Sequence, residues 1–165
     1  MHSSQSPVCI LRICALFLFI ICCYPALAQN QPNILPEFKF LKVDGTPFNK
    51  SQIKALEKSI IIYFDPSCDH CQDEIEKIGK RYGDFKNVSF YLVSANGKAE
   101  VSTFMQTYGK QLNGKKNVTV LLDTKMEFIP KFSPTQYPAI YVYSQGKLIK
   151  YFSGTTNVND ILAAK

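Results

Sequence analysis

The sequence has little of what most protein metal sites are built from. Its 165 residues include two histidines and six cysteines, and there is no tryptophan. Four of the cysteines and one histidine lie within the first 28 residues, which leaves Cys68, His70 and Cys71 beyond them. A structural zinc ion needs about four ligands, and His70 lies between the two cysteines, where it is poorly placed to join them. These absences argue against a metal site in the later part of the chain.

The sequence also lacks an apolar run long enough to cross a membrane. Residues 13–23 form an apolar stretch of 11 residues, whereas a spanning helix needs about 20. The lone positive charge of Arg12 precedes this stretch, and Ala26-Leu27-Ala28 supplies a small-x-small cleavage pattern. We therefore expect residues 1–28 to be a signal peptide, so that the protein is exported and soluble after cleavage. It would meet a membrane only if this segment were retained.

The charge pattern gives no sign of a nucleic-acid site. After residue 28 the chain keeps 18 of its 19 basic residues and all 13 acidic residues, a formal charge of +5. The lysines are scattered, and no basic stripe alternates with aromatic residues, so we expect no nucleic-acid partner. The remaining 137 residues are the usual size of one domain. We expect a flexible leader over residues 29–36 and a single domain over residues 37–165.

Hydrophobic patterns in this domain predict alternating strands and helices. Residues 59–65 form a continuous apolar run rich in β-branched side chains, as in a strand covered on both faces. Residues 69–82 carry apolar side chains at spacings of three and four and precede Gly83, which predicts a helix. Further strands are expected at 38–43, 88–94, 118–122, 139–143 and 148–152. Further helices are expected at 98–111, 158–164 and, interrupted near Pro130, 125–132, with weak helical spacing at 51–58.

This order of elements predicts an α/β fold. Strands separated by helices require parallel crossovers, and the two successive strands near the C-terminus add an antiparallel edge. A turn at Asp44 and Gly45 joins two short extended pieces near the start of the domain. We therefore expect a mixed central sheet with helices on both faces and a short N-terminal β-hairpin.

The sequence Cys68-Asp69-His70-Cys71 lies where the strand at 59–65 gives way to the first helix. A helix beginning at Cys68 would offer its sulfur unpaired backbone N–H groups and the positive end of the helix dipole, which favour thiolate over thiol. The thiolate is the form that attacks disulfides. We predict Cys68 as the nucleophile and Cys71 as the resolving thiol of a redox pair. A purely structural disulfide is less favoured because such a short loop restrains little unfolded-chain entropy.

The two residues between the cysteines are expected to tune this chemistry. His70 can donate a hydrogen bond or a positive charge to a Cys68 thiolate. Asp69 and the nearby Asp65 act in the opposite sense, because negative charge disfavours a thiolate. The two effects leave the direction of electron flow open.

Taken together, the motifs resemble the thioredoxin-like superfamily, and within it the exported thiol-disulfide oxidoreductases of the TlpA and ResA type. The cysteine pair matches their active-site position, and residues 133–143 are similar to the segment that holds a cis proline. The resemblance implies a thioredoxin-like fold in which Pro138 is the cis proline, with Pro134 as the rival. It also implies that the backbone of Tyr137 binds an extended substrate segment.

The same resemblance implies a location in the periplasm or cell envelope and no cofactor. The partners it implies are proteins that carry disulfides or thiols, together with a redox partner that the sequence does not name.

The sequence departs from the family pattern at two positions. Ser67 stands where the family often has tryptophan, and Ile62 stands where thioredoxin carries a buried acid. Another group or a water molecule must then move the proton of Cys71, and Asp65, Glu74 and Glu100 are the candidate side chains.

Two other functions are compatible with a protein of this kind. A copper-binding metallochaperone of thioredoxin fold is the main alternative, although such proteins usually add a distant histidine, which residues 29–165 lack. A thiol peroxidase needs threonine or serine three positions before its cysteine, where this chain has Asp65, so the motif argues against a dedicated peroxidase.

Overall fold

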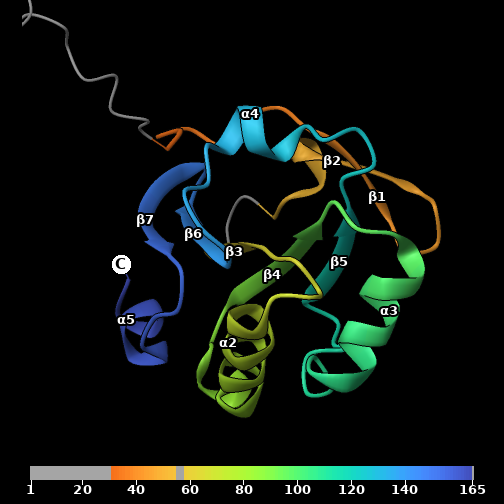
Figure 1. Ribbon diagram of the computed structural model, residues 1–165. Coiled ribbons are helices and arrows are strands. Elements are labelled where there is room, and N and C mark those ends of the chain that lie inside the picture. Colours follow the sequence, from red (N-terminus) through yellow and green to blue (C-terminus); the bar gives the residue numbers. More distant parts are fainter. Residues whose placement is uncertain (1–30, 55–57, 165) are drawn as a thin grey trace, which may run out of the picture.

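The computed structural model describes residues 31–54 and 58–164, and these residues contain one sheet of seven strands (Figure 1). The signal peptide expected at residues 1–28 lies outside the described residues. Across the sheet the strands follow the order β2-β1-β5-β4-β3-β6-β7. Their bounds are β1 Lys39–Lys42, β2 Pro47–Asn49, β3 Lys58–Tyr63, β4 Val88–Ser94, β5 Val118–Leu122, β6 Ala139–Ser144 and β7 Lys147–Ser153.

The sheet is mixed, as the order of elements predicts. The central strands β3, β4 and β5 are parallel to one another, whereas β6 pairs antiparallel with β3, and β7 pairs antiparallel with β6. The N-terminal hairpin of β1 and β2 joins the other side through antiparallel pairing of β1 with β5. The predicted α/β fold is confirmed.

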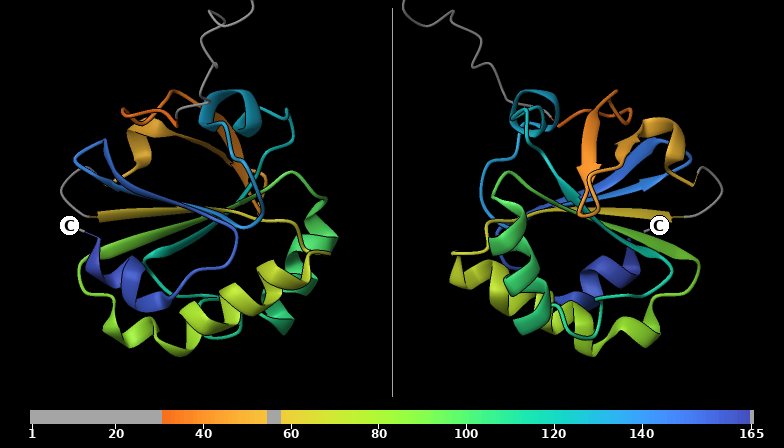
Figure 2. Two further views of the ribbon diagram at one scale, coloured as in Figure 1. Left: turned by 60° about the vertical axis from the view of Figure 1, so that its left-hand side comes forward. Right: turned by 90° about the vertical axis from the view of Figure 1, so that its right-hand side faces the viewer.

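Helices cover both faces of this sheet. In Figure 2 the helices α2 (Asp69–Lys80), α3 (Lys98–Thr107) and α5 (Val158–Ala163) lie on one face, and α4 (Phe128–Phe132) lies on the other. Short 3-10 turns occur at Lys50–Gln52 and Tyr82–Asp84. In the part of the chain that the structure describes, no helix combines the length and the apolar character needed to span a membrane.

Strand β3 lies between two hydrophobic cores. Its side chains alternate, so Ile60 and Ile62 pack into the core beneath α2, α3 and α5, whereas Ile61 and Tyr63 pack into the core beneath α4. All four are at most 1% exposed. The strand that leads to the cysteine pair is therefore fixed from both sides.

Several element boundaries differ from those expected. The helix expected at 98–111 ends at Thr107. Of the weak helical spacing at 51–58, the first residues lie in the 3-10 turn Lys50–Gln52, residues 55–57 lie outside the described residues, and Lys58 begins β3. The interruption expected near Pro130 is wrong, because α4 begins at Phe128 and includes that proline. Pro130 lies in the first turn, where a backbone N–H has no partner within the helix and its loss is tolerated.

Part of the segment that the sequence suggested as a leader packs along the hairpin of β6 and β7. The backbone N–H of Leu35 donates to the Gly146 carbonyl at 2.8 Å, and the N–H of Leu148 donates to the Asn33 carbonyl at 2.8 Å. The side chain of Leu35 is buried. These contacts attach residues 33–35 to the body of the domain.

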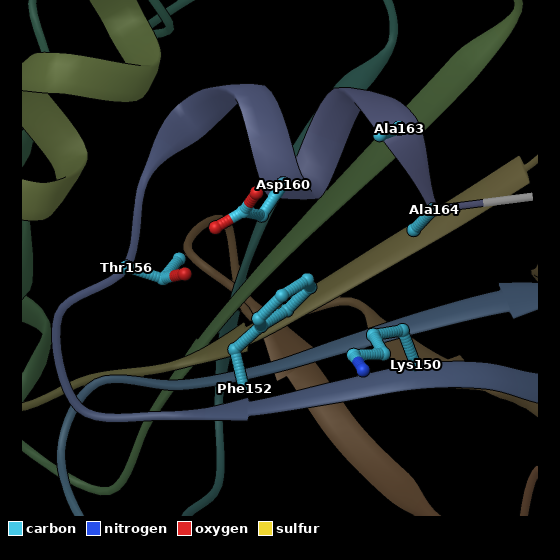
Figure 3. A pocket seen from close by; sticks show the side chains of 6 residues that line it. All are labelled: Lys150, Phe152, Thr156, Asp160, Ala163 and Ala164. Atoms are coloured by element: carbon cyan, nitrogen blue, oxygen red, sulfur yellow. The ribbon is translucent and has the colours of Figure 1, made fainter.

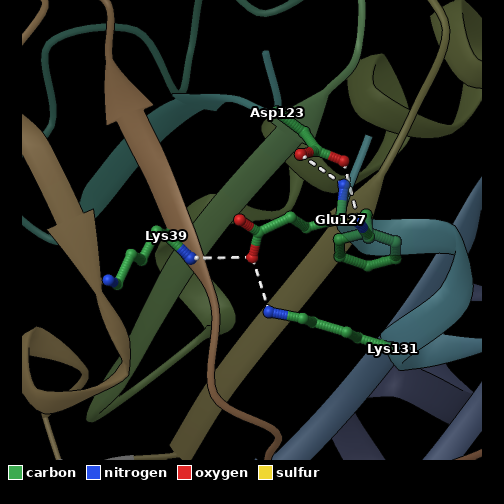
Figure 4. Close-up of polar contacts among 5 residues, drawn as sticks. Lys39, Asp123, Glu127 and Lys131 are labelled. Carbon is green, nitrogen blue, oxygen red and sulfur yellow. Dashed lines mark hydrogen bonds and ion pairs between the residues drawn. The ribbon is translucent and has the colours of Figure 1, made fainter. Parts of the chain in front are cut away.

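A buried carboxylate fixes the start of α4 (Figure 4). The Asp123 carboxylate, 1% exposed, accepts hydrogen bonds from the backbone N–H groups of Glu127 at 2.9 Å and Phe128 at 2.8 Å. Glu127 in turn accepts from the Lys39 N–H and from the Lys131 ammonium group. The start of α4 is thus linked to β5, and through Glu127 to β1.

Asp123→Ala should lower the free energy of unfolding by about 2 kcal/mol, because it leaves two backbone donors of the α4 start without an acceptor. Urea unfolding of the variant measures the loss. Asp123→Asn keeps one side-chain acceptor, so its free energy of unfolding should fall by less. Thr124→Ala, at the exposed neighbouring position, should have a free energy of unfolding close to that of the wild type. An Asp123→Ala protein as stable as wild type would contradict the prediction.

Candidate functional site

A tight turn connects the end of β3 to the cysteine pair. The Asp65 carboxylate accepts hydrogen bonds from the Ser67 backbone N–H at 2.8 Å and from the Ser67 hydroxyl at 2.7 Å. The N–H of Cys68 donates to the Asp65 carbonyl at 3.1 Å. This pattern is typical of an aspartate that stabilises its own turn. It places Cys68 at the position immediately before the helix.

The two cysteines differ in their surroundings. Cys68 is the N-cap residue of α2 and is partly exposed, whereas Cys71, in the first turn, is fully buried. The Cys71 N–H donates to the Cys68 carbonyl at 2.9 Å, and the two thiols are free. The pair therefore combines one sulfur that a substrate can reach with one that it cannot reach directly.

The electrostatic environment of Cys71 favours the protonated thiol. Burial raises the pKa of Cys71 to about 12, and the Cys68 side chain and the charge of Asp65 act in the same direction. A hydrogen bond with the Asp65 backbone acts in the opposite sense. Cys71 is consequently a thiol at neutral pH, and it must lose its proton before it can attack a disulfide.

His70 and Asp69, the two residues expected to tune the pair, are exposed on the first turn of α2. Among residues 31–54 and 58–164, neither makes a hydrogen bond to a cysteine. Their tuning roles stay predictions from the sequence.

The Tyr137–Pro138 peptide bond is cis, as the resemblance implied for Pro138 rather than Pro134. It immediately precedes β6, whose first residue, Ala139, pairs with Tyr63 at the end of β3. The bond thus lies at the end of the sheet from which the cysteine loop leaves β3. Tyr137 is 38% exposed, and its ring centroid lies 5.2 Å from that of Tyr63. The contact with Tyr63 was not expected, because an aromatic residue inside a buried strand gives no signal beyond packing.

The candidates for the missing acid lie in three different environments. Ile62, where thioredoxin has its acid, packs in the same apolar cluster as Cys71. Glu100 is exposed and accepts from the Gly97 N–H at 3.0 Å. Asp65 acts on Cys71 directly through its charge. Glu74 is fully buried on α2, three residues after Cys71.

Glu74 has a buried carboxyl group of which one oxygen accepts a hydrogen bond. Its Oε2 accepts from the Thr156 N–H at 3.3 Å, and within the described residues its Oε1 has no hydrogen-bond partner. Burial raises the pKa of Glu74, and the Thr156 hydrogen bond partly opposes this. The same Thr156 lines a hollow of about 520 Å³ between β7 and α5, shown in Figure 3. Neither cysteine lines this hollow, so it is separate from the candidate site.

Glu74→Gln should remove part of the pH dependence of stability. A raised pKa means that the folded protein holds the proton more tightly than the unfolded chain, whose ordinary value is 4.5. This contribution is fully present below pH 4.5 and is lost as the pH rises through the folded-state pKa. Compared with Glu74→Gln, the wild type should therefore lose stability between pH 4.5 and neutrality, as measured by thermal unfolding at several pH values.

Glu76→Gln is the matched control for this prediction. Glu76 lies on the same helix, is partly exposed and pairs with Lys80 at 3.6 Å. The melting temperature of Glu76→Gln should change with pH as that of the wild type does. If the melting temperatures of Glu74→Gln and of the wild type changed with pH to the same extent, the expected effect of Glu74 burial would be contradicted.

A second hollow, of about 460 Å³, lies next to the cysteine loop. Pro66 and Ser67 line it from the loop, and Phe104 and Tyr108 are among the residues that line it from α3 and the turn after it.

Within the described part of the chain, no group of three or more histidine, cysteine or acidic side chains is placed to hold a metal ion.

Comparison with known proteins gives the family and supports the fold. A model of the AhpC/TSA family matches residues 33–152. No curated protein matches the chain. The structure of dsbF from Mycobacterium tuberculosis, in mixed oxidized and reduced forms, is 21% identical with a TM-score of 0.66, over 81% of this chain and 95% of that chain.

Two further structures have similar scores. A thio-disulfide isomerase from Thermus thermophilus is 21% identical with a TM-score of 0.64, over 82% of this chain and 94% of that chain. The peroxidoxin BcpB from Mycobacterium tuberculosis is 13% identical with a TM-score of 0.65, over 81% and 94% of the two chains. At these identities the likeness is one of fold, and the expected thioredoxin-like fold is confirmed. Because the family model spans most of the chain, including both cysteines and the Tyr137–Pro138 bond, the protein belongs to the AhpC/TSA family.

Proposed function

We propose that the protein is a thiol-disulfide oxidoreductase that exchanges disulfides with substrate proteins in the cell envelope. The observation that carries this proposal is the pairing of a partly exposed Cys68 at the start of α2 with a buried Cys71 one turn on. Two similar structures support it, since dsbF is described in oxidized and reduced forms and the Thermus thermophilus protein is named a thio-disulfide isomerase. The envelope location rests on the signal peptide expected at residues 1–28.

The proposed reduction proceeds in two exchanges. The Cys68 thiolate attacks one sulfur of a substrate disulfide, so that a Cys68–substrate disulfide forms and the other substrate sulfur leaves and takes up a proton. Cys71 then gives up its proton and attacks the Cys68 sulfur. The Cys68–Cys71 disulfide forms, and the second substrate sulfur leaves as a thiol. Two electrons pass to the substrate, and the reverse sequence oxidises a substrate dithiol.

The Tyr137–Pro138 segment is proposed to hold the substrate during these steps. Proline lacks a backbone N–H, and the segment lies immediately before β6, at the end of the sheet where β3 ends. An extended substrate segment could pair with the backbone of Tyr137 in the manner of an added strand. A separate thiol or disulfide partner would restore the redox state of the cysteine pair after each turnover.

Three assays on the purified protein test the function. The proposal expects catalysed reduction of insulin disulfides by dithiothreitol, little turnover of hydrogen peroxide and no tight stoichiometric binding of Cu(I). Tight Cu(I) binding with little insulin turnover would favour the metallochaperone. Rapid peroxide turnover without insulin reduction would favour a peroxidase of the kind named by the BcpB structure.

The reduction potential of the Cys68–Cys71 pair then decides the direction of electron flow. Known proteins of this type range from about −270 mV for thioredoxin to about −120 mV for a strong oxidant. A value near the first would make the protein a reductant of substrate disulfides, and a value near the second an oxidant of substrate thiols.

A further inference from the structure

Tyr63 is a fully buried residue at the end of β3, five positions before Cys68. It pairs with Ala139, the residue after the cis Tyr137–Pro138 bond. Side chains alternate along a strand, so its ring lies on the α4 side of the sheet, whereas Ile62 faces the side that holds Cys71. Tyr63 thus adjoins the candidate substrate-binding segment from the face opposite to the cysteine pair.

Four aromatic rings form a continuous row through this position. The Tyr137 centroid lies 5.2 Å from that of Tyr63, which is stacked on Phe128 at 4.1 Å, and Phe128 is stacked on Phe132 at 4.1 Å. The far end of the row belongs to α4, which Asp123 fixes at its start. Tyr63 therefore connects a half-exposed ring beside the cis bond to a rigid part of the core.

The contact between Tyr63 and Tyr137 joins two rings whose planes are tilted by 34°. Among the described residues the Tyr63 hydroxyl has no hydrogen-bond partner of good geometry. Burial, and then the neighbouring Tyr137 side chain, raise the pKa of Tyr63. The polar contact of this hydroxyl with Tyr137 lacks the geometry of a good hydrogen bond, so we assign the contact mainly to the two rings, whose centroids lie 5.2 Å apart. Phenylalanine could therefore provide the same support.

We propose that Tyr63 is a positioning residue for protein substrates: its ring holds Tyr137, and through it the backbone that pairs with an extended substrate segment. This inference rests on the proposed disulfide exchange. A small disulfide needs only the Cys68 sulfur and no strand pairing. Loss of the support should therefore slow exchange with proteins and spare exchange with small disulfides.

The test compares insulin with Ellman's disulfide as substrates. Tyr63→Leu removes the ring and should raise the KM for insulin about three- to tenfold, the size of effect that one aromatic contact produces. Its rate with Ellman's disulfide should stay within about twofold of wild type. Tyr63→Phe keeps the ring, so its KM for insulin and its rate with Ellman's disulfide should both match the wild type. An unchanged KM for insulin in Tyr63→Leu, or an equal loss with both substrates, would overturn the proposal.

Phe90→Leu controls for a general loss of packing. Phe90 is a fully buried aromatic residue on the adjacent strand β4, and it packs in the other core, against Phe85 and Tyr82. It should lower the melting temperature without raising the KM for insulin. If Phe90→Leu raised the KM for insulin as much as Tyr63→Leu, the effect would come from a general loss of core packing, and the positioning role of Tyr63 would be overturned.

A double-mutant cycle tests the same contact from the exposed side. If Tyr63 acts through Tyr137, the double variant Tyr63→Leu, Tyr137→Leu should have the KM of Tyr137→Leu alone. Additive effects would overturn the proposal, and if Tyr63→Leu does not fold, Tyr63→Met takes its place in the cycle. Failure of the proposed function is a separate result, because a wild type that does not reduce insulin would show it before any variant is compared.

Discussion

Cys68→Ala should abolish the catalysed reduction of insulin, with a loss of about 10³-fold or more, as is usual when a covalent nucleophile is removed. The remaining thiol cannot replace it. Cys71 is fully buried, and burial is the main cause of its pKa of about 12, so it is neither accessible nor ionised at neutral pH. The turbidity of precipitating insulin chains in dithiothreitol measures the catalysed rate.

The controls separate lost chemistry from lost structure. Cys68 is partly exposed and its side chain does not cap α2, so the substitution should leave the melting temperature close to that of wild type. Ser67→Ala removes the hydroxyl bond to Asp65 but keeps the backbone bond from the Ser67 N–H and both sulfurs, so it should keep most of the activity. Full insulin reduction by a folded Cys68→Ala protein would rule out the proposed mechanism.

Cys71→Ala should make the protein accumulate as a mixed disulfide with its substrate. The first exchange at Cys68 can still occur, but the buried thiol that would displace the substrate is gone, so the Cys68–substrate disulfide accumulates. We expect a covalent adduct with one insulin chain, visible by mass spectrometry of the intact protein and released by excess dithiothreitol. Alanine suits this position better than serine, because it adds no hydroxyl to an apolar cluster.

The wild-type protein gives the matching pH dependence. The pKa of Cys71 is raised, so the fraction ionised grows about tenfold for each pH unit below about 12. The mixed disulfide of the wild type should therefore decay faster as the pH rises from 6 to 9, whereas the Cys71→Ala adduct should lack this acceleration. Adducts that form equally with Cys68→Ala, or that fail to form with Cys71→Ala, would contradict the assigned order of attack.

The sequence was most informative where a structural preference is local. The apolar run that became β3 and the spacing of Ile75 and Ile78 on α2 are set by neighbours in the chain, and both elements lie where they were expected. The pairing of β1 with β5 joins residues about 80 positions apart, and no local pattern records it. Pro130 illustrates another limit, because its effect depends on where the helix begins, and the apolar spacing alone does not show that the helix begins at Phe128, where Asp123 accepts the first backbone N–H groups.

The candidate site also combines features that local sequence predicts with features that only the folded chain brings together. The positions of Cys68, Cys71 and the cis Tyr137–Pro138 bond follow from short motifs. The burial of Glu74 does not, because a glutamate on an amphipathic helix is usually exposed, and only the fold brings the Thr156 N–H to it. The role proposed for Tyr63 likewise depends on the packing of α4 across the sheet.

The central place of β3 in the sheet also affects how the molecule opens. This strand is paired along its whole length on both sides, with β4 and with β6. Strands with two partners in a buried core are among the last segments whose amide protons exchange with solvent, whereas strands with one partner, here β2 and β7, exchange earlier. The loop that carries Cys68 therefore follows a strand that we expect to exchange slowly, so that local opening of the edge strands should leave the spacing of the two sulfurs unchanged.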